Sequence, residues 1–145
     1  IVSIGLTPDA LETRCVGDEH AAYPEDRAVS VAYRRARVAG DLVHGFRHGA
    51  WFVDLAGVTD DEGVAIAVAD VLGARKARGR PVLASLVTWF ARKQLLLVLD
   101  NCEHLLPACA ALADAVLRGA AQVRVLATSR EPLGIEGEQA HPVLP

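Results

Sequence analysis

The residue run that most constrains the fold is Leu95–Asp100, in which five aliphatic side chains precede a carboxylate. An uninterrupted apolar run has no polar face, so it is typical of a strand covered on both sides, in a parallel sheet flanked by helices. Burying each of these side chains contributes roughly 1.5–3 kcal/mol, which suits the centre of a sheet. Asp100 then lies at the carboxyl end of the strand, where open α/β sheets bind ligands.

Other predicted strands and helices alternate around this run. A short strand is predicted at Trp51–Leu55, and Thr59 or Asp60 can cap a helix over residues 62–72. The remaining predicted elements are helices over residues 30–46, from Pro81 to about Arg92 and from Asp100 or Asn101 to Gly119, and strands at 122–127 and 138–144. This alternation predicts an α/β fold, a three-layer parallel sheet with helices on both faces.

The chain divides into an irregular N-terminal segment, residues 1–29, and one α/β domain, residues 30–145. The first segment holds a short apolar stretch, Ile1–Leu6, that is compatible with a strand, but Gly17, Pro24 and scattered charges break any period after it. With 145 residues, of which 52% are hydrophobic, the chain is long and apolar enough to bury a core.

Composition and charge exclude several classes of function. A net charge of −3 gives no electrostatic case for direct DNA binding or for an anionic membrane, and no apolar run approaches the ~20 residues of a membrane span. No signal peptide is visible, and the three cysteines lack metal-site spacing, so we expect a cytoplasmic chain with reduced thiols. The chain contains no methionine, and we expect it to be an excerpt of a longer protein.

Polar residues that suit nucleotide chemistry follow two of the predicted strands. Asp100 ends one strand, and Thr128, Ser129 and Arg130 end another, so a parallel sheet would bring them to one edge. There Asp100 can hold a magnesium ion, usually through water, and the planar fork of Arg130 suits a terminal phosphate. Thr128 or Ser129 can donate a hydrogen bond to a phosphate or position a water molecule.

Each of these residues also has a structural interpretation. Asp100 and Glu103 are spaced as a capping-box-like pair at the start of a helix. Arg130 can form a surface ion pair with Glu131 or Asp100, worth about 0–1 kcal/mol.

Three further polar positions have ordinary structural interpretations. Asp54 is predicted to form a turn at the end of a strand, and His104 is predicted to be a polar helix position near the sheet edge. His44 and His48 are four residues apart, but the glycines beside them make a helical metal site improbable.

Three stretches resemble consecutive motifs of a known domain. They are Trp51-Phe-Val-Asp-Leu-Ala-Gly-Val-Thr-Asp60, Leu95-Leu-Leu-Val-Leu-Asp-Asn-Cys-Glu-His-Leu-Leu106 and Val125-Leu-Ala-Thr-Ser-Arg-Glu-Pro-Leu-Gly134. In order and spacing they are similar to the STAND-class (NB-ARC-like) P-loop ATPase domain of large bacterial transcriptional regulators of the LuxR and SARP types. The resemblance covers roughly residues 38–145.

This resemblance implies a nucleotide-dependent switch that controls oligomerisation and transcription, with ATP and magnesium as cofactors. Asp100 resembles the Walker B residue that holds magnesium, and Arg130 resembles the sensor arginine that reads the terminal phosphate. Asn101, Thr128 and Ser129 would then border the nucleotide. The implied partner is the remainder of a regulator, whose DNA-binding and sensor domains lie outside this chain.

The chain departs from that family at the phosphate-binding loop. The motif G-x-x-x-x-G-K-[ST] should precede the predicted helix over residues 30–46, but Pro24–Ser30 contains neither its glycines nor its lysine. The only lysines, Lys76 and Lys93, do not follow glycine. Losing two charge-assisted contacts costs about 3–6 kcal/mol, so we expect weak or lost nucleotide binding and no significant ATPase activity.

Three alternatives account for the missing loop. Codon degeneracy allows residues 25–31, read one base upstream, to encode Gly-Pro-Gly-Gly-Val-Gly, so the chain can be a frame-disrupted or decayed copy, a hypothesis that the gene's DNA decides. A second interpretation is a non-catalytic protein-interaction scaffold that retains the NTPase fold. A third is an active ATPase whose phosphate site is built from Arg34, Arg35 and Arg37.

Overall fold

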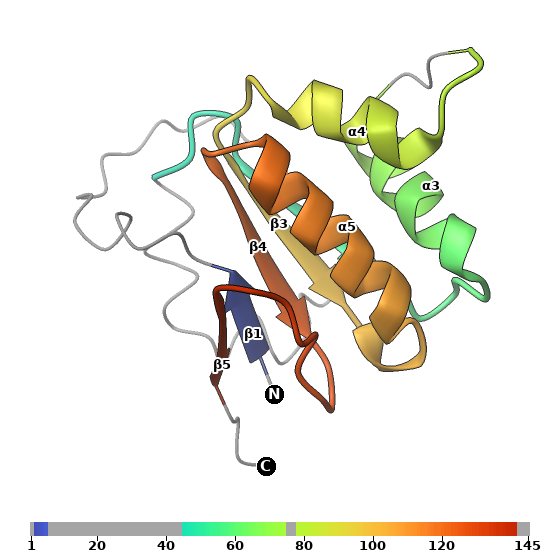
Figure 1. Cartoon of the computed structure of the whole chain (residues 1–145), viewed down its shortest axis with the longest axis vertical. Helices are drawn as coiled ribbons and strands as arrows, with labels where there is room; N and C mark the ends of the chain where they lie inside the picture. Colours follow the sequence, from blue (N-terminus) through green and yellow to red (C-terminus); the bar gives the residue numbers. More distant parts are fainter. Residues whose placement is uncertain (1, 6–44, 75–77, 142–145) are drawn as a thin grey trace, which may run out of the picture.

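The protein is described by a computed structural model over residues 2–5, 45–74 and 78–141 (Figure 1). Its elements are strands β1 (Val2–Gly5), β2 (Ala50–Asp54), β3 (Leu95–Asp100), β4 (Val123–Thr128) and β5 (Glu138–His141), helices α3 (Asp61–Leu72), α4 (Val82–Phe90) and α5 (Leu106–Gly119), and a 3₁₀ turn, η2 (Cys102–His104). The predicted α/β class is confirmed. No helix in these ranges has the length and apolar character needed to cross a membrane.

The five strands form one sheet in the order β2-β3-β4-β1-β5. Strands β2, β3 and β4 are parallel, as predicted, and the partners of Val98 on either side are Phe52 and Leu126. Strand β1 runs antiparallel to both β4 and β5. The sheet is therefore mixed, with parallel pairs from β2 to β4 and antiparallel pairs from β4 to β5, rather than parallel throughout. The predicted boundary between residues 29 and 30 lies outside the described residues.

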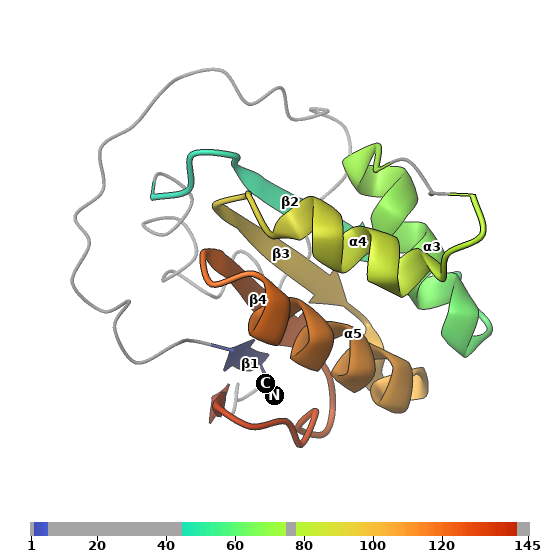
Figure 2. The same ribbon diagram turned by 45° about the horizontal axis from the view of Figure 1, so that its top comes forward.

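Helices α3, α4 and α5 form a layer on one face of the sheet (Figures 1 and 2). Alternate residues of β3 and β4 point into this layer, because successive side chains of a strand face opposite sides. The buried cluster between the layers includes Leu97, Val125, Leu86, Phe90 and Leu112. This cluster is the main core of the described fold.

The opposite face of β3 is also buried. Leu96 and Val98 form a separate cluster with Leu126, and Phe46 and Ala50 pack against it. Strand β3 is therefore apolar on both faces, which explains its uninterrupted aliphatic sequence. Residues 30–44 of the helix predicted over residues 30–46 lie outside the described residues.

The ends of α3 follow from its sequence as predicted. The Asp60 side chain accepts a hydrogen bond from the Gly63 N–H at 2.7 Å, which satisfies one of the unpaired donors of the first turn. Gly73 ends the helix in the left-handed conformation, with φ of 62°, where a residue without a Cβ is favoured. Helix α4 begins directly after Pro81, as predicted.

Helix α5 begins later than predicted. Asn101 adopts a left-handed backbone conformation, with φ of 62° and ψ of 47°, and this conformation turns the chain out of a helical path directly after β3. The turn η2 follows, and α5 starts only at Leu106, with Pro107 in its first turn. Neither start has a side-chain cap, so the prediction of a capping-box-like pair of Asp100 and Glu103 is wrong.

Candidate functional site

The parallel strands bring polar side chains to one edge of the sheet. Asp54 and Asp100 are register partners at the carboxyl ends of β2 and β3, and Thr128 ends the neighbouring strand β4. The sequence predicts this meeting of Asp100 and Thr128, since adjacent parallel strands end at the same edge. We call this edge, with Asp54, Asp100, Asn101 and Thr128, the carboxylate rim.

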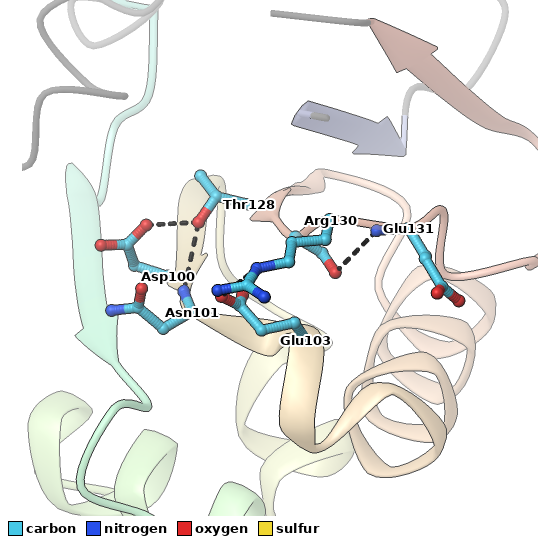
Figure 3. A network of polar contacts seen from close by, with 7 residues as sticks. Asp100, Asn101, Glu103, Thr128, Arg130 and Glu131 are labelled. Atoms are coloured by element: carbon cyan, nitrogen blue, oxygen red, sulfur yellow. Dashed lines mark hydrogen bonds and ion pairs between the residues drawn. The ribbon is translucent and has the colours of Figure 1, made fainter. Parts of the chain in front are cut away.

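Asp100 is buried and hydrogen-bonded within the carboxylate rim. Its carboxylate accepts a hydrogen bond from the Thr128 hydroxyl (Figure 3), and 7% of the residue is exposed. The Thr128 oxygen in turn accepts a hydrogen bond from the Asn101 N–H at 3.2 Å. Because a buried carboxylate without hydrogen-bond partners is costly, the Thr128 hydroxyl stabilises Asp100 in this place.

Asn101 connects the rim to strand β2. Its side-chain N–H donates to Asp54 Oδ1 at 2.9 Å, and the same oxygen accepts from the Ala56 N–H at 2.9 Å. The second contact confirms Asp54 as a strand-end turn former. The hydrogen bond from the Asn101 side chain to Asp54 was not predicted. Asparagine is one of the few residues that tolerate the left-handed conformation found at this position.

The loop after β4 places Ser129 and Arg130 differently. Ser129 is buried, and its hydroxyl oxygen accepts a hydrogen bond from the Glu131 N–H at 3.3 Å. The Arg130 side chain is 86% exposed, and its Nε lies 3.6 Å from Glu103 Oε1 (Figure 3). The ion pair is therefore made with Glu103 rather than with Glu131 or Asp100, the two partners considered from the sequence.

The rim fits part of a magnesium–nucleotide complex. Asp100 supplies carboxylate oxygens, which are the donors that magnesium prefers. Among the described residues no lysine reaches the phosphate side, because Lys93 precedes the amino end of β3, at the opposite edge, with its ammonium 4.8 Å from the Trp89 ring centroid. Lys76 and the three arginines Arg34, Arg35 and Arg37 lie outside the described residues.

His48 and His104 each make a hydrogen bond to a backbone group. His104 lies in η2 rather than in a regular helix, and its Nε2 is 2.9 Å from the Val58 carbonyl oxygen. His48 Nδ1 accepts a hydrogen bond from the Gln94 N–H at 2.9 Å. Within the described ranges no group of three or more metal-binding side chains occurs. His44 lies outside the described residues, so the predicted pair of His44 and His48 is described only in part.

Cys102 and Cys109 are buried free thiols beneath the rim. A hydrogen bond with Cys109, together with burial, raises the pKa of the Cys102 thiol. The same hydrogen bond lowers the pKa of the Cys109 thiol. Both side chains are buried in the main core, where free cysteines pack as small apolar side chains.

Part of the chain is similar to proteins of Mycobacterium. The chain is 40% identical over 102 residues to an uncharacterized protein of Mycobacterium tuberculosis, an alignment that covers 70% of this chain and 26% of the relative. It is 46% identical over 92 residues to a protein of the same organism named "Putative HTH-type transcriptional regulator", which covers 63% of this chain and 10% of the relative.

The same two kinds of relative occur in Mycobacterium bovis, with the same identities. No protein-family model and no solved structure matches the chain. The chain spans about a quarter of the length of the first relatives and a tenth of the regulators. It is thus similar to short parts of longer mycobacterial proteins, some of which bear the name "Putative HTH-type transcriptional regulator".

Proposed function

We propose that this chain is part of a STAND-type regulatory domain of a bacterial transcriptional regulator, in which nucleotide binding is weak or lost. The ordered motifs at the carboxyl ends of β2, β3 and β4 support the NTPase-like assignment. The 46% identity to a protein named as a transcriptional regulator supports the regulatory role. The remainder of the regulator, rather than DNA, is the partner of this domain.

The observation that carries the proposal is the direction of β1. A phosphate-binding loop must follow its strand at the carboxyl edge of the parallel sheet, where its backbone N–H groups reach the ligand. In the antiparallel strand β1, Val2 pairs with Thr128 at the rim, and Gly5 pairs with Val125 farther down β4. The carboxyl end of β1 therefore lies away from the rim, so this strand does not bring its carboxyl end to the edge that a phosphate-binding loop would occupy.

The charges around the rim support the same proposal. Asp54, Asp100 and Glu103 place three carboxylates near the position that phosphates would occupy, and Glu103 already pairs with Arg130. A phosphate must compete with that carboxylate for the guanidinium and is repelled by the others. With no described lysine at this edge, a polyphosphate lacks the contacts that usually hold it.

Equilibrium binding of labelled ATP in the presence of magnesium tests the proposal. We expect no saturable binding in the micromolar range, with the same result for Asp100→Ala, because the phosphate contacts are missing. Micromolar affinity that is lost on Asp100→Ala would overturn the proposal. Measurable hydrolysis abolished by Arg130→Ala would instead establish an active ATPase with an unusual phosphate site.

A second candidate function is a protein-interaction scaffold that ignores nucleotide altogether. It is favoured by the hydrogen bond from Thr128, which satisfies buried Asp100 without any ligand. Thermal unfolding with millimolar magnesium–ATP separates residual weak binding from complete indifference to nucleotide. Weak binding raises the melting temperature slightly in the wild type but not in Asp100→Ala, whereas an indifferent scaffold melts at the same temperature with and without ATP.

A further inference from the structure

We propose that Glu138 is a positioning residue for the loop between β4 and β5, and that it thereby fixes the location of Arg130. The inference rests on the proposed function only in placing the Arg130 guanidinium and Glu103 beside the carboxylate rim. Glu138 lies eight positions after Arg130, at the start of β5, and pairs with Gly5 in the sheet rather than with any rim residue. It therefore acts through the loop and not by contact with a ligand.

The carboxylate of Glu138 binds two consecutive backbone amides of this loop. Its Oε1 accepts a hydrogen bond from the Leu133 N–H at 2.7 Å, and its Oε2 accepts from the Gly134 N–H at 2.6 Å. Hydrogen bonds to an ionised acceptor are shorter and stronger than neutral ones. One side chain thus fixes two successive peptide groups on the return half of the loop.

The other half of the loop is fixed close to the rim. Ser129 is buried, and its side chain binds the Glu131 N–H. Leu133 and Ile135 pack against the main core on the return half. Arg130 therefore lies between two anchored points, one made by Ser129 and the other by Glu138.

Arg130 depends on this backbone support because its own side chain is held weakly. The guanidinium is mostly exposed, and its 3.6 Å contact with Glu103 is of the kind that contributes little by itself. Figure 3 shows the Arg130 side chain extending from the loop toward Glu103 on η2. If the loop backbone moved, the ion pair with Glu103 would be too weak to hold the guanidinium near the rim.

The test compares Glu138→Gln with Glu136→Gln in the full chain, without nucleotide. Both variants remove one negative charge from the same segment, but Glu136 is exposed. Two signals are followed by NMR: hydrogen exchange of the Leu133 and Gly134 amides, and the Nε–H resonance of Arg130. Glu103→Gln supplies the resonance position of an Arg130 that has lost its partner.

We expect Glu138→Gln to accelerate exchange at Leu133 and Gly134 by about tenfold or more, because two charge-assisted bonds are weakened. The Arg130 resonance should move toward its position in Glu103→Gln, a change that a uniform loss of stability does not produce. Glu136→Gln should leave both signals at their wild-type values.

Three outcomes would overturn the proposal: unchanged exchange in Glu138→Gln, faster exchange with an unmoved Arg130 resonance, or equal effects in the Glu136 control. If Glu138→Gln does not fold, Glu138→Asp keeps the charge but is too short to reach both amides, and the same signals decide. Neither signal requires ATP, so a failure here is distinct from a failure of the proposed function, which the ATP titration measures.

Discussion

The two sides of the sheet differ in direction and in what they bring to the rim. On the β2–β3–β4 side the strands are parallel, and their carboxyl ends place Asp54, Asp100 and Thr128 in one hydrogen-bonded network. On the β1–β5 side, β1 is reversed and brings its amino end to the same edge. The comparison teaches that polar side chains gather at one edge only where neighbouring strands run parallel, and that a reversed strand brings its amino end there instead.

The two sides should also differ most strongly in their contribution to stability. Leu97 is fully buried in β3, whereas Gln139 in β5 is exposed. We expect Leu97→Ala to lower the free energy of unfolding by about 2–5 kcal/mol and Gln139→Ala to change it by less than about 0.5 kcal/mol. Chemical denaturation measures both, and equal losses would show that the β1–β5 side is as tightly packed as the parallel side.

The Thr128 hydroxyl should be the next largest contribution on the parallel side. Thr128→Val removes the donor to buried Asp100, and we expect a loss of about 1–3 kcal/mol. Thr88→Val is the matched control, since the exposed Thr88 hydroxyl only donates to a carbonyl within its own helix. If the two variants unfold at the same denaturant concentration, the rim network does not stabilise the fold.

Substitutions of Asn101 separate its backbone conformation from its side-chain contact. Asn101→Ala places in the left-handed region a residue that lacks the polar side chain by which asparagine tolerates it, and loses the bond to Asp54, so we expect a cost of about 1–2 kcal/mol. Asn101→Gly loses the same bond but accepts the conformation, and should cost less. A glycine variant less stable than the alanine variant would contradict the left-handed turn.

The exposed ion pair should have the smallest effect. Glu103→Gln removes the partner of Arg130, and the expected change in unfolding free energy is about 0–1 kcal/mol, decreasing further in high salt. Denaturation at low and high ionic strength measures it. A larger, salt-independent loss would mean that Glu103 has another role in η2.

Sequence reasoning recovered those features that have a local cause. The aliphatic run of β3, the Asp60 cap, Gly73 and Pro81 all act on their immediate neighbours, and the elements that they define are confirmed. The meeting of Asp100 with Thr128 followed from strand polarity alone. The left-handed turn at Asn101 was missed because the sequence here also fits a helix start.

The features that sequence reasoning did not recover depend on distant partners. Nothing in the four residues of β1 specifies whether they pair parallel or antiparallel with β4, because direction is set by the connection and not by the strand. The pairing of Arg130 with Glu103, and the two hydrogen bonds to Glu138, join residues whose proximity depends on how the loop after β4 turns.

The direction of β1 is the central claim, and cross-strand nuclear Overhauser effects measure it most directly. Antiparallel pairing brings the Cα atoms of alternate partners to about 4.5 Å, so we predict Hα–Hα contacts within one alternating set of the pairs Val2–Thr128, Ser3–Ala127, Ile4–Leu126 and Gly5–Val125. A parallel pattern, in which Val2 lies near the start of β4 and Gly5 approaches Thr128, would contradict the account. It would also turn the carboxyl end of β1 toward the rim.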